Sequence, residues 1–155
     1  PLNRDGHGAE WLSKDSYRMR SDAKKYETWE SNLSSKFGLA IALRYLNDLG
    51  ISEIQQRVIE LTSQFRIELN KTSHITIHDT GQSQSGIITF TSSIKQPDEI
   101  KQLLSEQGIN VSVVVASSAI LDLDVRKIKD AVRASVHYYN TEDEMKTMIE
   151  ILENI

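Results

Sequence analysis

Apolar residues recur at helical spacing over residues 33–69, and they divide into two predicted helices. The first runs from Leu33 to Leu49, and Gly50 is suited to end it because glycine readily adopts the left-handed backbone that follows many helices. In the second, Ser52 and Gln55 match a capping box that marks a helix start. The apolar stripe that this second helix would bury consists of Ile54, Val58, Leu61, Phe65 and Leu69.

After residue 74 the pattern changes to a period of two, which is typical of half-buried strands. Glycine, proline or a capping residue marks most boundaries of the later elements. The predicted elements are strands at 75–77 and 88–90 joined as a hairpin, a helix from Pro97 to Gly108, strands at 111–115 and 132–138 separated by a loop at 116–130, and a last helix opened by a capping box of Thr141 and Glu144.

This order of elements predicts an α+β fold. The order is two helices, two strands, a helix, two strands and a final helix. The simplest arrangement of these elements is a small, largely antiparallel four-stranded sheet with helices packed on one face. We expect this domain to occupy residues 33–155. Residues 1–32 show no apolar period and are predicted to form an irregular arm, whose tryptophans, Trp11 and Trp29, we expect to pack on this domain or on a missing one.

The amino-acid composition excludes several classes of function. The 155 residues are 39% hydrophobic and 26% charged, with a net charge of -4, which fits a globular domain. The basic residues are scattered, so a nucleic-acid partner is not expected. No apolar run is long enough for a membrane span. There is no cysteine, which excludes disulfides and thiolate chemistry within this chain. The chain begins at Pro1 without a signal peptide, and we expect it to be a piece of a longer protein.

One face of the last predicted strand carries Arg133, Ser135, His137 and Tyr139. Such a polar face is either simply solvated or covers a site supplied by another domain. Arg133 suits the second interpretation because a guanidinium on a rigid strand can bind a carboxylate through two hydrogen bonds.

Other catalytic motifs are missing from the sequence. On a strand, His74 and His78 would lie about 13 Å apart, too far to share a metal ion. No phosphate-binding loop and no dinucleotide glycine fingerprint is present. The sequence therefore offers no complete active site and no metal site.

The segment from Val132 to Glu144 resembles the C-terminal signature of class V aminotransferase-fold enzymes, a group that includes cysteine desulfurases, selenocysteine lyases and isopenicillin-epimerase-like proteins. In this signature an arginine is followed two residues later by a serine and then by Tyr-Asn-Thr before an acidic helix start. Weaker pieces of the resemblance are Gly8–Trp11, Tyr26–Asn32 and Gly108–Val111.

The resemblance implies an enzyme that depends on pyridoxal phosphate (PLP) and acts on an amino acid. The cofactor would be held in an upstream large domain by a Schiff-base lysine, so no catalytic residue is expected here and residues 1–32 would be left from the junction. Arg133 matches the arginine that binds the substrate carboxylate. Homodimerisation and a cytoplasmic location are further expectations. By itself, this chain is expected to bind no cofactor and to be inactive.

The sequence also departs from the family pattern. The loop at 116–122 lacks the cysteine of desulfurases, so sulfur transfer through a protein persulfide is not expected. Trp29 and Glu30 replace a Gly-Thr pair that contacts the cofactor phosphate of the neighbouring subunit, which leaves Glu30 and Asn32 as weak candidates for cofactor binding. Lys71, Lys95, Lys127 and Lys129 are expected to be ordinary solvated lysines.

Two other classes of function remain open at this point. A four-stranded sheet backed by helices also suits a freestanding small-ligand-binding or regulatory module. An interaction domain without chemistry is the other alternative. A binding module would need a closed pocket of its own, whereas a part of a larger enzyme would show a flat, unfilled polar face.

Overall fold

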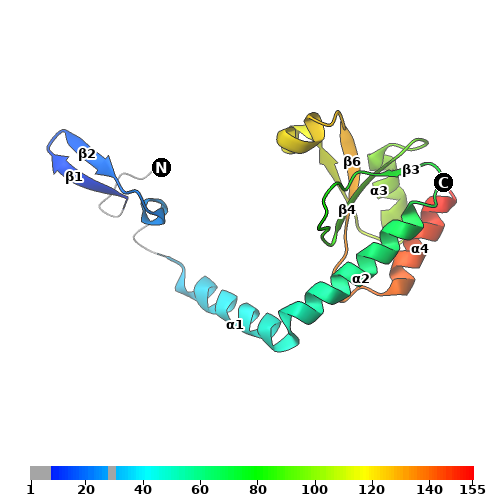
Figure 1. Cartoon of the computed structure of the whole chain (residues 1–155), viewed down its shortest axis with the longest axis horizontal. Helices are drawn as coiled ribbons and strands as arrows, with labels where there is room; N and C mark the ends of the chain where they lie inside the picture. Colours follow the sequence, from blue (N-terminus) through cyan, green and yellow to red (C-terminus); the bar gives the residue numbers. More distant parts are fainter. Residues whose placement is uncertain (1–7, 28–30) are drawn as a thin grey trace. The chain divides into compact units, whose positions relative to one another are not determined.

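A computed structural model of the chain describes residues 8–27 and 31–155. The chain forms two compact units, residues 1–48 and residues 49–155, and each is described by itself (Figure 1).

The first unit contains a hairpin where an irregular arm was predicted. Strand β1 (Ala9–Ser13) pairs antiparallel with β2 (Ser16–Met19), and a 3₁₀ turn follows at Ala23–Tyr26. The rings of Trp11 and Tyr17 face each other across the hairpin, with centroids 6.1 Å apart, which is a stabilising cross-strand pair. Trp11 is 63% exposed, so Tyr17 is its ring neighbour among the described residues, and packing of Trp11 on a missing domain stays a prediction. Trp29 lies outside the described residues.

Helix α1 (Leu33–Leu49) has the bounds that the sequence predicted. The side-chain oxygen of Asn32 accepts a hydrogen bond from the backbone N–H of Ser35 at 3.0 Å, which caps the first turn. None of the residues of α1 is buried. The helix therefore exposes its large apolar side chains, which are Leu33, Phe37, Leu39, Ile41, Leu43, Tyr45 and Leu49.

The second unit is built on a four-stranded sheet in the order β3-β4-β6-β5, with every neighbouring pair antiparallel. The strands are β3 (Ile75–Ile77), β4 (Ile87–Ser92), β5 (Ser112–Val115) and β6 (Asp130–Ser135). The predicted hairpin of β3 and β4 is confirmed, and β6 lies in the interior of the sheet.

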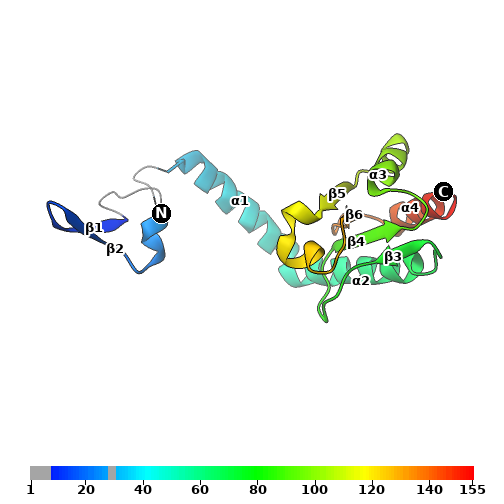
Figure 2. The same ribbon diagram turned by 90° about the horizontal axis from the view of Figure 1, so that it is seen from above.

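Helices α2 (Ile51–Leu69), α3 (Pro97–Glu106) and α4 (Glu142–Glu153) bury their apolar sides against one face of this sheet (Figures 1 and 2). The α+β fold with helices on one face is thereby confirmed. The core of the unit consists of Leu61, Phe65, Leu69, Ile75, Ile88, Phe90, Ile100, Leu104, Val132, Ala134, Val136, Met148, Ile149 and Leu152.

Several boundaries differ from the prediction. Gly50 directly follows the last residue of α1, as predicted, with φ of 90°. It is also the N-cap of α2, which begins at Ile51, so Ser52 already lies in the first turn and does not cap this helix. The capping box of Thr141 and Glu144 is confirmed. The loop at 116–130 contains a 3₁₀ turn and a short π-helix, Ile120–Asp124.

Candidate functional site on the open face of the sheet

Polar residues form a row across the sheet on the face opposite the helices. Arg133 of β6 is in register with Thr89 of β4 on one side and with Ser112 of β5 on the other. His78 follows β3 and continues the row, since its backbone N–H donates to the carbonyl oxygen of Thr89 at 2.8 Å. Because side chains alternate along a strand, these four residues project to the face that the core does not use.

Arg133 is the free cation of this row. Its side chain is exposed, and it has no hydrogen-bond or ion-pair partner within residues 8–27 and 31–155. Its backbone is held between two neighbouring strands, so the start of the side chain has a fixed position. Such a guanidinium can bind a planar carboxylate through two parallel hydrogen bonds. Ser135, two residues later, is also exposed and adds a hydroxyl to the same face.

A buried ion pair fixes the connection between β3 and β4 beside this row. Arg66, which is 7% exposed, donates from Nε to Oδ2 of Asp79 at 2.8 Å and from its terminal nitrogen to the carbonyl oxygens of Ser85 and Ile87 at 2.9 Å. The other oxygen of Asp79 accepts from the backbone N–H and the hydroxyl of Thr89, both at 2.9 Å. The pair therefore holds the neighbour of Arg133 in place. Sequence reasoning missed it because its partners are thirteen residues apart in different elements.

The imidazole of His78, on the same face, has a lowered pKa. Burial lowers the pKa of its imidazole, nearby Arg126 lowers it further, and Asp79 opposes both effects. Its Nε2 lies 2.9 Å from the hydroxyl of Thr91, and Arg126 donates to its backbone carbonyl oxygen as well as to Asp122. The segment at 116–130 is thus tied to the edge of the sheet.

The two spaced histidines have separate partners. One ring nitrogen of His74 lies 3.0 Å from the hydroxyl of Ser92, and the other lies 3.0 Å from the carbonyl oxygen of Leu152 in α4. Among the described residues, no group of three His, Cys, Asp or Glu side chains is placed to hold a metal ion.

Other candidate residues lie away from the row. Asn32 caps α1, and Glu30 is outside the described residues. Strand β6 ends at Ser135 and not at Tyr138 as predicted, so His137 and Tyr139 belong to the turn into α4. There the ring of His137 lies 4.3 Å, centroid to centroid, from the rings of Tyr138 and Tyr139. Predicting them as part of the polar strand face was wrong, because the chain turns once Asn140 bonds back to His137.

Arg133 is not among the residues that line two cavities of the second unit. One, of about 460 Å³, is lined by α2 and α4. Another, of about 530 Å³, is lined by α4, by Phe65 of α2, by the segment that follows α3 and by the end of β6 with the turn after it. Arg133 therefore stands on an open surface. As for membranes, none of the described helices combines the length and the apolar character needed to cross one.

Comparison with known proteins gives one consistent result. Residues 1–148 match the family described as aminotransferase class-V. A protein of Methanothermobacter thermautotrophicus described as a probable cysteine desulfurase is 27% identical over 147 residues, which is 93% of this chain and 37% of that protein. This chain therefore spans little more than a third of the length of that relative.

Solved structures show the same fold. A cysteine desulfurase from Escherichia coli superposes with a TM-score of 0.79 at 21% identity, covering 99% of this chain and 38% of that one. C-DES with glycine covalently linked to its PLP cofactor superposes with a TM-score of 0.68 at 22% identity, covering 96% of this chain and 36% of that one. Since the family match extends over nearly the whole sequence, this chain belongs to the class-V aminotransferase family.

Proposed function

We propose that this chain supplies the substrate-carboxylate site of a PLP-dependent enzyme that acts on an amino acid, with Arg133 as the binding residue. The observation that carries the proposal is the unpaired guanidinium of Arg133 on an interior strand of a rigid sheet, on the face that the helices leave open. The C-DES structure, in which an amino acid is linked to the cofactor, supports this class of substrate.

Arg133 would act by orientation. A carboxylate gripped by two hydrogen bonds cannot rotate freely, so the bonds at the α-carbon of the amino acid acquire a fixed direction. The buried pair of Arg66 and Asp79 would support this by holding Thr89, which lies opposite Arg133. Arg133 is the residue of this chain that would touch the substrate.

The described residues do not form a cradle for the cofactor on this face. The four strands contain no lysine to hold an aldehyde, and Asn32 is used in capping α1. Lys71 forms an ion pair with Glu68. We therefore assign PLP to other residues of the enzyme, and we expect this chain alone to show no turnover.

Helix α1 supports the existence of such a further part. A helix that is apolar on all sides is normally enclosed by protein, whereas α1 has no buried residue among those described. An upstream cofactor domain, in a homodimer, is the covering partner that our proposal implies. The absence of cysteine means that no thiol of this chain could accept sulfur, so the proposal leaves the reaction type open.

The decisive experiment is a kinetic comparison in the full-length protein that contains this sequence, with L-cysteine as the first amino acid assayed. Arg133→Ala should raise KM by about 10- to 100-fold, the loss expected for a charge-assisted hydrogen bond. Arg133→Lys keeps the charge but not the paired N–H donors of the guanidinium, so its KM should lie between those of the unaltered enzyme and Arg133→Ala. Arg57→Gln, which removes a positive charge from α2, is the matched control and should leave KM unchanged. Unchanged KM and turnover in Arg133→Ala would disprove the role.

The size of the native polypeptide provides an independent check. An antibody raised against this chain should detect a band more than twice the size of 155 residues in the source cells. A band at about 18 kDa, the mass expected for 155 residues, would favour the alternative of a freestanding ligand-binding module.

A further inference from the structure

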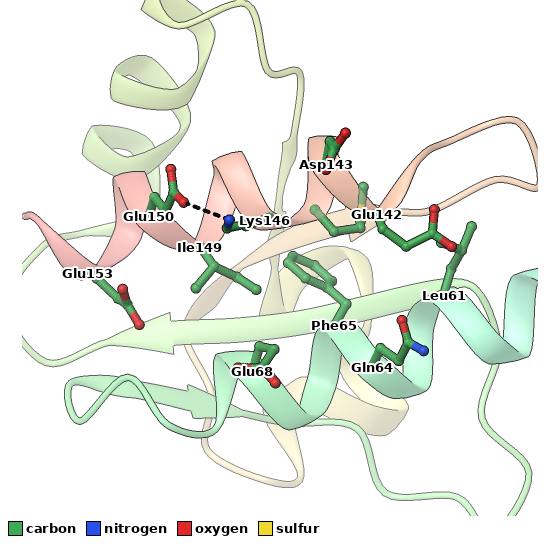
Figure 3. Close-up of a pocket in the computed structure, with 11 residues that line it drawn as sticks. Leu61, Gln64, Phe65, Glu68, Glu142, Asp143, Lys146, Ile149, Glu150 and Glu153 are labelled. Carbon is green, nitrogen blue, oxygen red and sulfur yellow. Dashed lines mark ion pairs between the residues drawn. The ribbon is translucent and has the colours of Figure 1, made fainter.

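A groove of about 460 Å³ runs between α2 and α4 and is lined by these two helices alone (Figure 3). Its floor is apolar, since Leu61 and Phe65 of α2 face Met145 and Ile149 of α4. Within each helix these residues are spaced four apart, so the floor follows the helix axes. The groove is separate from the polar row of Arg133, which lies on the opposite face of the sheet.

The walls of the groove are acidic. Helix α4 carries five carboxylates and one lysine, a net charge of -4, which equals the net charge of the whole chain. The rest of the chain is therefore neutral overall, with as many basic as acidic residues. The carboxylates that line the groove are Glu68, Glu142, Asp143, Glu150 and Glu153.

Local cations compensate only part of this charge. Arg57 pairs with Glu142 at 2.6 Å and Lys71 with Glu68 at 2.6 Å, while Lys146 is 3.8 Å from Glu150. Asp143 and Glu153 have no ion-pair partner within the part of the chain that the structure describes. Exposed pairs of this kind are weak and can be exchanged for the cations of a partner.

We propose that this groove is a docking site for a basic amphipathic helix of a partner protein. Lysine or arginine side chains of that helix would pair with Asp143, Glu150 and Glu153, and its apolar stripe would lie along the floor at Phe65 and Ile149. Phe65 is 1% and Ile149 8% exposed, so docking buries little additional apolar surface at the floor. The carboxylates would therefore contribute most of the binding free energy. A second copy of this chain fits less well, because its own acidic helix α4 would be repelled by the acidic walls of the groove.

The test uses the 155-residue chain and a fluorescein-labelled 18-residue peptide of lysine and leucine, with the leucines at helical spacing. Fluorescence anisotropy should show binding that weakens as salt is added. Asp143→Asn, Glu150→Gln and Glu153→Gln, combined in one variant, should raise Kd at least about 10-fold. Gln64→Arg, which adds a cation to the opposite wall, should also weaken binding.

The matched control combines Asp98→Asn, Glu106→Gln and Asp124→Asn, which removes the same charge from exposed positions elsewhere. It should change Kd by less than about 2-fold if the groove is the site. Circular dichroism verifies that each variant is folded, and NMR should show shifts at the methyl groups of Leu61, Met145 and Ile149. The proposal is overturned if the peptide does not bind, if both triple variants weaken binding equally, or if shifts are confined to α1.

Discussion

Charged side chains in this chain have two distinct roles. Arg66 and Asp79 form a largely buried pair, with side-chain exposures of 9% and 12%, and both carboxylate oxygens of Asp79 accept hydrogen bonds. An unpaired charge at that depth would be strongly destabilising, so the two side chains are constrained to keep this paired geometry. The pair of Arg57 and Glu142 is exposed and joins α2 to the first turn of α4. There the hydrogen bond from Arg57 lowers the pKa of the Glu142 carboxyl.

Glu142 provides a prediction at this scale. The hydrogen bond from Arg57, followed by the backbone hydrogen bond at the start of the helix, lowers the pKa of its carboxyl from 4.5 to about 2. Because the folded pKa is below the unfolded one, this group stabilises the fold above about pH 4.5, and its contribution is lost as the pH falls towards 2. Arg57→Gln should raise the pKa of Glu142 towards 4.5, measured by carboxyl NMR titration. Arg44→Gln, on α1, should leave it unchanged, and an unshifted pKa in Arg57→Gln would contradict the assignment.

Elements in the second unit meet at close backbone contacts. The segment between β3 and β4 returns to the sheet at Gly86, whose carbonyl oxygen accepts from the N–H of Val136 at 2.8 Å. A Cβ atom at Gly86 would lie 2.5 Å from the carbonyl oxygen of Val136 and 2.9 Å from Cγ1 of Val58. The turn after β6 and the middle of α2 can therefore approach this position only because residue 86 has no side chain.

Gly86→Ala should therefore lower the free energy of unfolding by about 1–3 kcal/mol, the usual cost of overpacking. Urea denaturation followed by far-UV circular dichroism would measure it, because both tryptophans of the chain, Trp11 and Trp29, lie outside residues 49–155. Gly38→Ala is the control, since a Cβ there meets nothing within 4 Å, and it should leave the transition of residues 49–155 unchanged. Equal stability of Gly86→Ala and the unaltered chain would show that Val136 moves without cost.

On the scale of the whole molecule, apolar residues are used in two ways. The second unit encloses fourteen of them in one core. Helix α1 leaves its apolar residues exposed, although its sequence is as regular as that of α2. Phe65 and Phe37 therefore represent the same side chain in opposite environments, 1% and 71% exposed.

This contrast gives a paired prediction. Phe65→Ala should lower the free energy of unfolding of residues 49–155 by about 3–5 kcal/mol, because it removes contacts and leaves a cavity. Phe37→Ala should change it by no more than about 0.5 kcal/mol. Chemical denaturation of the 155-residue chain measures both. A similar loss in the two variants would mean that α1 is packed in the isolated chain.

The sequence alone determined the local elements of this protein. The bounds of α1, the hairpin of β3 and β4, Pro97 at the start of α3 and the capping box of Thr141 and Glu144 were all predicted. These features depend on periodicity and on side chains that bond within four residues, so a single sequence contains the required information. The family resemblance was also visible, because its motif is contiguous.

Tertiary structure decided the rest. The hairpin at residues 9–19 brings Trp11 and Tyr17 together across its two strands. Strand β6 ends at Ser135 because the chain turns where Asn140 bonds back to His137. The row of His78, Thr89, Arg133 and Ser112 is set by strand register, and the acidic groove by the packing of α2 beside α4. The row and the groove join residues that are distant along the chain, and only the folded backbone brings such residues within reach of one another.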